Sequence, residues 1–349
     1  MRGLLRPFLQ GALHLVILTC IHASHANAQP QPARLFVELP EYCPTPDAFD
    51  IAPDGSLTLS CPNFADRDSP SVLMRITPDG TVSKICEIPG LSEGQKGIAM
   101  GIAYGPEGEL YVCNPKGGDR GRILRMTFTR DGSLARTEVV AEGMACPNGI
   151  RYHEGAVYVT QPQLPKFGTE KNTGGLYRFL VTDRNVQVNN DASDTNLVFT
   201  AETQNPEKQF GLDGLVFTAA GSLLVGDLGD GTIYELKFEA DGSLDSSSLY
   251  AQLPRDAGID GIHIDDKGNV YAAGLRQNQI LKVDTKGQVH VIAQYPDNDG
   301  SNGQIDQPSD LFVYGNKLVI ANFDLMTGAD MVNTKHEAPF TLSYIELED

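Results

Sequence analysis

The sequence predicts an all-β fold, a six-bladed β-propeller with four antiparallel strands in each blade, from three observations. A unit of two apolar runs separated by a glycine turn stands at 211–231, and such runs are typical of paired strands. The unit occurs six times at intervals of 47 to 65 residues, and strand repeats of about 40–50 residues indicate a propeller. An extra strand sequence before the first unit would close the ring. The inner strands of the six units are headed by Asp47, Met100, Asn148, Asp213, Asp260 and Ser309.

The first 28 residues have the features of a cleavable signal peptide. Arg2 and Arg6 precede the apolar run 12–21, and Ala26-Asn27-Ala28 has the small-x-small pattern of a cleavage site. We therefore expect cleavage after Ala28, a secreted or periplasmic location, and one propeller domain over 29–349. No later stretch approaches the ~20 apolar residues of a membrane span, so none is expected.

The strand order explains how the ring closes. Each unit predicts an inner, a second, a third and an outer strand, with Asp-Gly or similar turns before the outer strands. Residues 34–40 resemble the outer strands of other units, and residues 341–345 have the pattern of a third strand. The last blade is therefore predicted to combine three C-terminal strands with one N-terminal strand, which leaves no open sheet edge. Third strands are expected at 72–75, 123–126, 175–178, 233–236 and 280–283.

Loop lengths predict which face carries the function. Turns between strands one and two, and between three and four, are expected to be short, whereas the other connections are long and lie where the inner strands begin. Long loops on a rigid scaffold usually carry function, so we expect this face, the mouth, to hold the site. Residues 333–337 have two interpretations, part of a lid over the mouth or an ordinary surface loop. The long connections are 63–71, 114–121, 161–174, 323–340, 90–99 and 296–308.

Composition restricts the partners. The chain has 27 Lys and Arg against 45 Asp and Glu, a net charge of −18, which argues against nucleic acid and anionic membranes. This charge suits cation binding, or solubility alone. Five cysteines remain after cleavage, so at least one is unpaired. Cys61 and Cys113 end the second strands of neighbouring blades. The sequence allows two alternatives for them, a disulfide between the two or buried free thiols.

The residues that head the inner strands predict a metal site, because four of the six carry oxygen ligands and the blades converge on one axis. Oxygen ligands favour Ca²⁺, with Mg²⁺, Mn²⁺ or Zn²⁺ as alternatives; zinc is less favoured because the remaining histidines lack ligand spacing. A structural alternative is that Asp-Gly and Asn-Gly serve only as turn dipeptides. The predicted ligands are Asp47, Asn148, Asp213 and Asp260.

Other residues near the strand ends at the mouth are weaker candidates. Lys96 lies in a blade-to-blade connection, and His263 is expected to pack rather than act as a base because it alternates away from Asp260. Residues 297–301 resemble the start of a Ca²⁺ loop, but Asn302 stands at the sixth place, where such a loop needs glycine, and no helices flank the segment. A plain connecting loop is therefore expected. The predicted substrate-binding residues are Met100, Asn114, Asp227 and Asn322.

The segments Pro147-Asn148-Gly149 and Leu212-Asp213-Gly214, with the strands 110–112 and 157–160, resemble the senescence marker protein/gluconolactonase (regucalcin-like) family. The resemblance extends from about Phe36 to Ile345 and implies a six-bladed, divalent-metal lactonase. It implies metal ligands in blades one, three and four, at Asp47, Asn148 and Asp213. Two positions depart from the family: Asp47 replaces a Glu, and Met100 replaces a substrate-contacting Asn. These departures argue against a sugar lactone.

The predicted function is an exported, divalent-metal-dependent hydrolase of a small lactone or ester. In this hypothesis Asp213 serves as metal ligand and base. The alternative is a propeller that binds a ligand or protein without catalysis. A strictosidine-synthase-like propeller would need a Glu at the mouth, and none heads an inner strand. We expect a monomer with a small-molecule partner, no nucleic acid and no membrane span.

Overall fold

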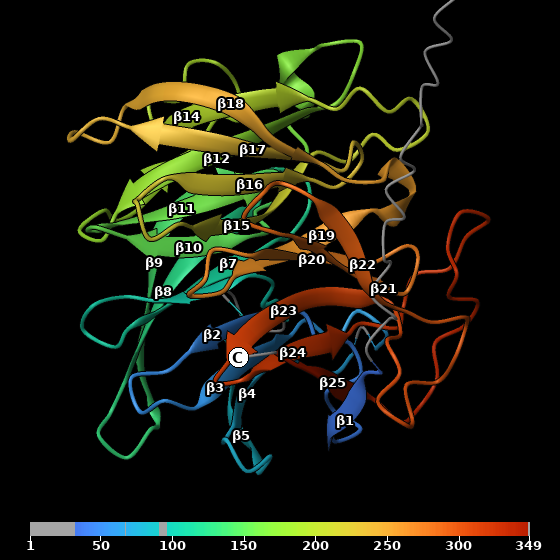
Figure 1. Ribbon diagram of the computed structural model, residues 1–349. Helices are drawn as coiled ribbons and strands as arrows, with labels where there is room; N and C mark the ends of the chain where they lie inside the picture. Colours follow the sequence, from blue (N-terminus) through green and yellow to red (C-terminus); the bar gives the residue numbers. More distant parts are fainter. Residues whose placement is uncertain (1–31, 67, 91–95, 348–349) are drawn as a thin grey trace, which may run out of the picture.

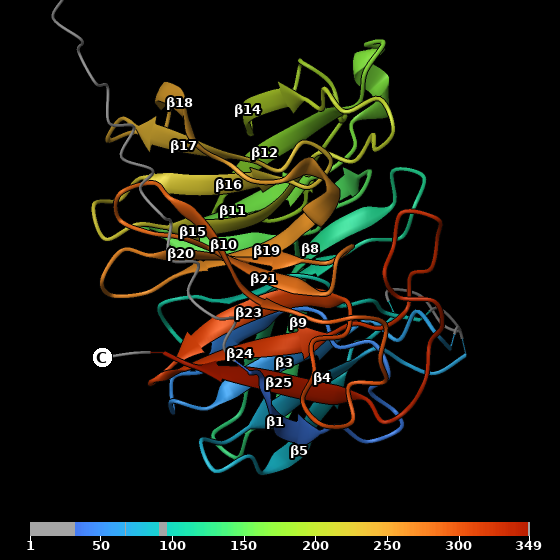
Figure 2. The same ribbon diagram turned by 45° about the vertical axis from the view of Figure 1, so that its right-hand side comes forward.

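Six sheets are arranged in a ring in the computed structural model, which describes residues 32–66, 68–90 and 96–347 (Figures 1 and 2). The predicted six-bladed β-propeller is confirmed. The predicted signal peptide lies outside the described residues. No helix in the described part of the chain is long and apolar enough to cross a bilayer.

The first three blades are built mainly from consecutive strands. Blade one contains β2 (Phe49–Ile51), β3 (Leu57–Cys61), β4 (Val72–Ile76) and β5 (Val82–Glu87). Blade two contains β6 (Ile102–Tyr104), β7 (Leu110–Asn114), β8 (Gly121–Phe128) and β9 (Leu134–Met144). Blade three contains β10 (Ile150–His153), β11 (Ala156–Gln161), β12 (Thr173–Leu180) and β14 (Leu197–Glu202), with the 3₁₀ turn η1 (Pro165–Phe167) between β11 and β12.

The last three blades repeat this order until the ring closes. Blade four contains β15 (Leu212–Phe217), β16 (Leu223–Asp227), β17 (Thr232–Phe238) and β18 (Leu244–Gln252), followed by η2 (Arg255–Ala257). Blade five contains β19 (Ile259–Ile264), β20 (Val270–Gly274), β21 (Gln279–Val283) and β22 (Val289–Gln294). Blade six contains β23 (Pro308–Tyr314), β24 (Lys317–Asn322), β25 (Thr341–Glu346) and β1 (Arg34–Glu38).

The N-terminal strand closes the ring as predicted. β1 pairs antiparallel with β25, from Arg34 opposite Tyr344 to Glu38 opposite Thr341. The next residue extends the contact, because the Leu39 N–H donates to the Phe340 carbonyl at 2.7 Å. Blade six therefore has its outer strand, and the first and last strands share one sheet.

Blade two departs from the expected four strands. β13 (Val186–Gln187) leaves blade three and pairs parallel with β9, which makes a five-stranded sheet. The prediction that every connection between strands three and four is short is wrong here, because residues 181–196 separate β12 from β14. Arg184 in this excursion bonds to Glu138 of β9 at 3.3 Å, so it also links the two blades through an ion pair.

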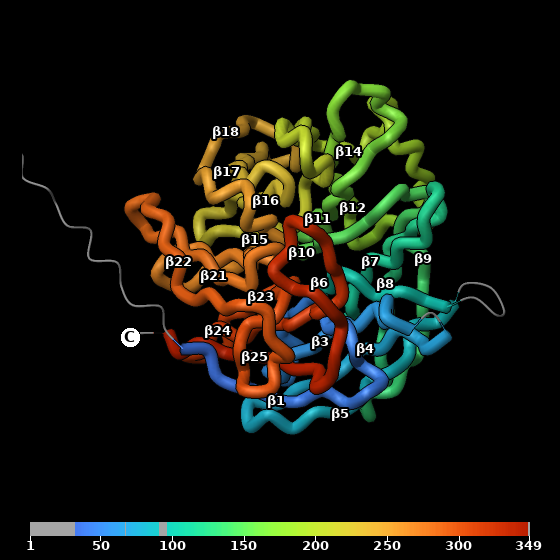
Figure 3. The backbone as a smooth tube through the Cα atoms, turned by 90° about the vertical axis from the view of Figure 1, so that its right-hand side faces the viewer, coloured from blue at the N-terminus to red at the C-terminus, as the bar shows by residue number. Residues whose placement is uncertain are grey.

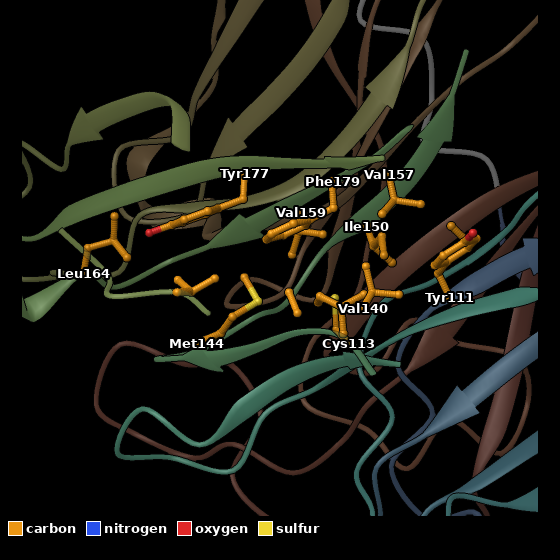
Figure 4. Close-up of a cluster of buried hydrophobic side chains, with 14 residues drawn as sticks. Tyr111, Cys113, Val140, Met144, Ile150, Val157, Val159, Leu164, Tyr177 and Phe179 are labelled. Atoms are coloured by element: carbon orange, nitrogen blue, oxygen red, sulfur yellow. The ribbon is translucent and has the colours of Figure 1, made fainter. Parts of the chain in front are cut away.

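Blades pack through apolar side chains on both sheet faces. Figure 4 shows the cluster between blades two and three, where Tyr111 and Cys113 face Ile150, Val157 and Tyr177. All five are fully buried. Because second strands such as β7 and β11 are covered on both sides, they read as nearly continuous apolar runs instead of alternating ones.

Glycines at the start of the inner strands let neighbouring blades approach each other. A Cβ placed on Gly214 would lie 2.3 Å from the Asp260 carbonyl oxygen, and one on Gly149 would lie 2.6 Å from that of Asp213. The same contact occurs at Gly101, where the would-be Cβ lies 2.3 Å from the Asn148 carbonyl oxygen. These glycines bring the residues that head the inner strands together on the axis.

Substituting Gly214→Ala is expected to destabilise the fold by about 3 kcal/mol, because the obstructing atoms belong to backbone and cannot rotate away. Urea unfolding would measure the loss. The matched control is Gly226→Ala on β16, whose Cβ would lie 3.3 Å from the flexible Ile259 side chain and 3.6 Å from the Gly214 carbonyl oxygen, which is an ordinary van der Waals contact. Equal stability of the two variants would contradict this account of the close approach.

Candidate functional site

Five of the six residues that head the inner strands line one small cavity on the axis. The cavity has a volume of about 30 Å³, room for a single water or ion. Met100 is the exception: it packs against the apolar cluster between blades two and three, and Gly101 lines the cavity in that blade. The polar residues of the lining are Asp47, Asn148, Arg151, Asp213, Asp260, Ser309 and Asp310, and Ala48 and Leu215 add apolar side chains.

Local backbone geometry places these side chains. The N–H groups of Asp47 and Asn148 donate to carbonyls of the second strands, Ser60 and Thr160, both at 2.9 Å. In blades four and five, the ladder is interrupted between Leu212 and Leu215 and between Ile259 and Ile262, so Asp213 and Asp260 lie in β-bulges. Bulges re-aim side chains, and here they occur at the cavity.

The carboxylates are buried together and repel each other. Asp47 is 7% exposed and Asp213 3% exposed. Burial and, after it, the charge of Asp310 raise the pKa of Asp47 to about 8. Burial and the neighbouring Asp47 and Asp310 carboxylates also raise the pKa of Asp213 well above its usual value. Burial and the charge of Asp213 raise the pKa of Asp260 in the same way. One stabilising contact is present, from Asn148 Nδ2 to Asp213 Oδ2 at 3.0 Å.

The sequence places Asp310 one residue beyond the head of its inner strand, and Asp310 was not among the predicted ligands, although it lines the cavity. Ser309 turns its hydroxyl away and donates it to the Asp47 and Pro46 carbonyls, at 3.0 and 3.1 Å. Asp310 Oδ2 accepts the Phe49 N–H at 3.0 Å, whereas its buried Oδ1 has no hydrogen-bond partner. Burial raises the pKa of Asp310 to about 6, against the lowering effect of Arg151.

Arg151 was also missed, although its position gave a signal. It lies three residues after Asn148, as Asp50 follows Asp47 and His263 follows Asp260. Its Nη2 is 3.9 Å from Asp310 Oδ2, and its charge influences Asp50 and His263 as well. Arg151 therefore lies at the cavity near two acids, Asp50 and Asp310, and its charge partly offsets the rise in pKa that burial causes in both.

His263 packs as expected. Burial and Arg151 lower its pKa to about 3, so the ring is neutral. It lies 4.2 Å from the Phe312 ring, and its Nδ1 accepts the Val313 N–H at 3.5 Å. Through its contacts with Phe312 and Val313, the neutral His263 ring links blade five to blade six.

The residues suit a hard cation by chemistry, but their present arrangement is not a formed metal centre. In the described ranges, no group of three or more His, Cys, Asp or Glu side chains is placed to hold a metal ion. The cavity nevertheless offers only oxygen ligands, several of them mutually repelling, and one unpartnered carboxylate oxygen. A bound Ca²⁺ would relieve that repulsion. The ligand roles of Asp47, Asn148, Asp213 and Asp260 stay predictions.

The predicted substrate-binding residues lie outside the cavity lining. Asn114 is fully buried and donates from Nδ2 to the Ile98 carbonyl at 2.8 Å. Asp227 accepts from Thr203 Oγ1 at 3.0 Å and from the Asp230 N–H at 2.9 Å, and burial raises its pKa to about 6. Asn322 donates to Thr341 and Ser343 and accepts from the Asp306 N–H.

These contacts are structural, and so are those of Lys96, whose ammonium donates to the Asn63 and Asp66 carbonyls at 2.7 and 2.8 Å. Met100 packs in the apolar cluster described above. Contact of Met100, Asn114, Asp227 or Asn322 with a substrate remains a prediction.

The connection between β24 and β25 lies across the mouth. In Figure 3, which looks toward the loop-rich face, this red segment crosses the centre of the ring. Asp330 holds it there, because its carboxylate lies 2.5 Å from both Lys208 Nζ and Arg276 Nη2. The Val332 N–H adds a bond to the Arg276 carbonyl at 2.9 Å. We call residues 323–340 the mouth strap.

Removing the Asp330 carboxylate is expected to loosen the mouth strap. In Asp330→Ala, amide hydrogen exchange at Met331 and Val332 should accelerate by roughly tenfold, since a charged hydrogen bond contributes on the order of 1–2 kcal/mol. Exposed Thr327→Ala, in the same segment, is the control and should leave exchange unchanged. Unaltered exchange in Asp330→Ala would show that other contacts hold the strap.

Comparison with known proteins gives a family match to part of the chain. The model of the SMP-30/gluconolactonase/LRE-like region matches residues 152–302, which span most of blade three, blades four and five, and the start of the next connection. Among proteins with curated descriptions, none matches the sequence significantly.

Solved structures share the fold at low sequence identity. A calcium-binding protein, regucalcin, from Agrobacterium tumefaciens has 14% identity and a TM-score of 0.57, over 91% of this chain and 96% of its own. A gluconolactonase from Xanthomonas campestris has 16% identity and a TM-score of 0.53, over 92% and 96%. A PQQ-bound aldose sugar dehydrogenase from Streptomyces coelicolor has 16% identity and a TM-score of 0.57, over 92% and 100%. These likenesses show the fold alone.

Proposed function

We propose that this chain, whose residues 152–302 match the model of the SMP-30/gluconolactonase/LRE-like region, belongs to that family and hydrolyses a small lactone or ester with a divalent cation at the mouth of its propeller. One observation carries the proposal. Asp47, Asp213 and Asp310 are buried and Asp260 is half-buried around one axial cavity, where Arg151 is the one cationic side chain in the described lining. Burying like charges is costly unless a ligand of opposite sign is bound.

In the proposed mechanism, Asp47, Asn148, Asp213 and Asp260 would hold the cation, most favourably Ca²⁺. A bound divalent cation supplies a Lewis acid that polarises the substrate carbonyl and stabilises the developing oxyanion. Asp213 is the base that accepts a proton from the attacking water. The Asn148 amide orients Asp213 by donating to Oδ2, which leaves Oδ1 for that proton. Arg151 offsets the charge of Asp310 at one side of the cavity lining, so the negative charge is concentrated at the other three carboxylates.

The direct test is turnover with and without a chelator. Purified protein would be assayed against a panel of lactones and aryl esters, and its metal content measured. Chelator-sensitive hydrolysis that returns on adding Ca²⁺ supports the proposal. Hydrolysis that survives removal of all bound metal contradicts the proposed role of the cation.

A second candidate function is a propeller that binds a cation or ligand without catalysis. The observation that favours it is the size of the axial cavity, which at about 30 Å³ has room for a single water or ion. Met100, packed into the core, also offers no polar contact to a substrate. Bound Ca²⁺ with no turnover on any panel member, in the wild type and in Asp330→Ala, would support this candidate.

We also propose export and a monomeric state. The basic and apolar N-terminal segment supports export, and N-terminal sequencing of the protein from the culture medium or periplasm should begin at Gln29. The high negative charge supports a monomer, which light scattering would test.

A further inference from the structure

Cys43 and Cys61 form a pair of thiols that the sequence did not reveal. All five cysteines of the described ranges are free, so of the two sequence alternatives the structure has buried thiols rather than a Cys61–Cys113 disulfide. Cys113 instead points to the next blade, where its Sγ contacts the Gly149 carbonyl at 3.8 Å. Cys61 lies near Cys43: both belong to one cluster of buried apolar residues, and the Cys61 thiol contributes to the raised pKa of Cys43.

The backbone around the two cysteines is fixed independently of that contact. Cys43 follows a turn in which its N–H donates to the Pro40 carbonyl at 2.8 Å. Cys61 ends β3, and its Sγ donates to Asn63 Oδ1 at 2.9 Å. The Asn63 amide in turn donates to the Tyr42 carbonyl at 3.0 Å, which ties the residue before Cys43 to the segment after Cys61. Both thiols belong to one apolar cluster and are fully buried.

We propose that Cys43 and Cys61 form a disulfide when the chain folds in the presence of a disulfide-bearing oxidant. One thiolate attacks the oxidant's S–S bond and forms a mixed disulfide, and the second thiolate then displaces the oxidant from it. The two cysteines lose two protons and two electrons in total, one S–S bond forms, and the oxidant is reduced to two thiols. The proposal does not depend on the hydrolase activity.

Folding controls when this exchange occurs. Burial and the Cys61 thiol raise the pKa of Cys43 well above its usual value, so the thiolate is scarce in the native state. Neither sulfur is accessible to a macromolecular oxidant after folding. The bond therefore forms during folding, or slowly through local opening. Cys86 and Cys146, which are half-buried in blade one and before blade three, have no cysteine partner in the described structure and stay as thiols.

The bond would enclose the segment that carries Asp47. A cross-link over a loop of this length is expected to raise the unfolding midpoint by roughly 5 °C, because it restricts the unfolded chain. It would also fix the approach of Asp47 to the axis, since both ends of the loop would be anchored in blade one. The cation site itself is not needed for this effect.

The experiment uses the chain from Gln29, refolded in a buffer of reduced and oxidised glutathione. Alkylation with one reagent before reduction and a second reagent after it, followed by peptide mapping, identifies the bonded pair. We expect a Cys43–Cys61 bond with the mass loss of two hydrogens, and Cys86, Cys113 and Cys146 labelled as thiols. Five labelled thiols, or any other intramolecular pair, would overturn the proposal.

Variants separate the bond from general effects on folding. Cys86→Ser should keep the disulfide and lose the same ~5 °C when a reductant is added. Cys43→Ser and Cys61→Ser should each show no disulfide and no response to reductant. Should either variant fail to fold, the reductant response of the wild type and of Cys86→Ser remains decisive. An unfolding midpoint that reductant does not alter in the wild type would contradict the stabilising effect.

Discussion

Asp213→Ala is expected to abolish chelator-sensitive hydrolysis, with kcat/KM falling by at least about a thousandfold, or roughly 4 kcal/mol of transition-state stabilisation. The loss combines two roles, because the same carboxylate would contribute to cation binding and accept the proton from water. It also frees Asn148 Nδ2, whose partner at 3.0 Å is removed. Steady-state kinetics on the best substrate of the panel would measure the effect.

The matched control for this prediction lies in the same blade. Asp241 is exposed in the turn between β17 and β18, where it accepts only from Ser243, so Asp241→Ala should retain full activity. Asp213→Asn keeps the shape of the side chain without its charge and should be nearly as inactive as Asp213→Ala. A folded Asp213→Asn with wild-type turnover would remove Asp213 from the mechanism.

Metal-free protein is expected to lose stability as the pH rises from about 4 to 8. The pKa of Asp47 is raised to about 8 and that of Asp310 to about 6, above the value of 3.8 for an unperturbed Asp. The folded state therefore holds protons that the unfolded state has released, and stability falls through this range. The pKa values of Asp306 and Asp324, which flank β23 and β24 of the last blade, are also raised, to about 8 and about 6. These two groups therefore also lower the stability as the pH rises. At 1.36 kcal/mol per pKa unit, the shift of Asp310 alone, from 3.8 to about 6, corresponds to about 3 kcal/mol.

Urea unfolding in a chelating buffer at pH 5, 6.5 and 8 would measure this slope. Saturating Ca²⁺ should reduce it, because a cation binds the ionised carboxylates of the folded state only. Asp47→Asn should also reduce it by removing one of the titrating groups. An unfolding free energy that stays constant from pH 5 to 8 in the chelator would refute the strong coupling among these carboxylates.

The ring of blades was predictable because its cause is repeated along the sequence. Each blade buries the same strands, so the apolar runs and glycine turns recur, and the turn at Gly221 has counterparts in the other blades. The pairing of β1 with β25 was predictable for the same reason, since residues 34–38 have the pattern of an outer strand. The gathering of Asp47, Asn148, Asp213 and Asp260 at one cavity followed from their common position in the repeat.

Features without a repeat could not be predicted in this way. β13 leaves its own blade to join β9, and nothing periodic marks Val186. The bulge between Pro308 and Asp310 places the Asp310 carboxylate at the cavity, one residue beyond Ser309. A local shift of register of this kind does not alter the apolar pattern of the sequence, so the pattern gives no sign of it. The contact of Cys43 with Cys61 depends on how a loop outside the repeat is held by Asn63. Each of these features is set by tertiary packing.

The sheet shared by β1 and β25 has a consequence for biosynthesis. Residues 34–38 leave the ribosome long before residues 341–346, with which they pair. β1 must remain unpaired until β25 has been synthesised. In an exported chain, the ring of blades would close only at the destination. A product truncated before Thr341 would expose two unsatisfied strand edges and be open to proteases. Only a chain that includes β25 can complete blade six, so closure of this sheet distinguishes complete chains from truncated ones.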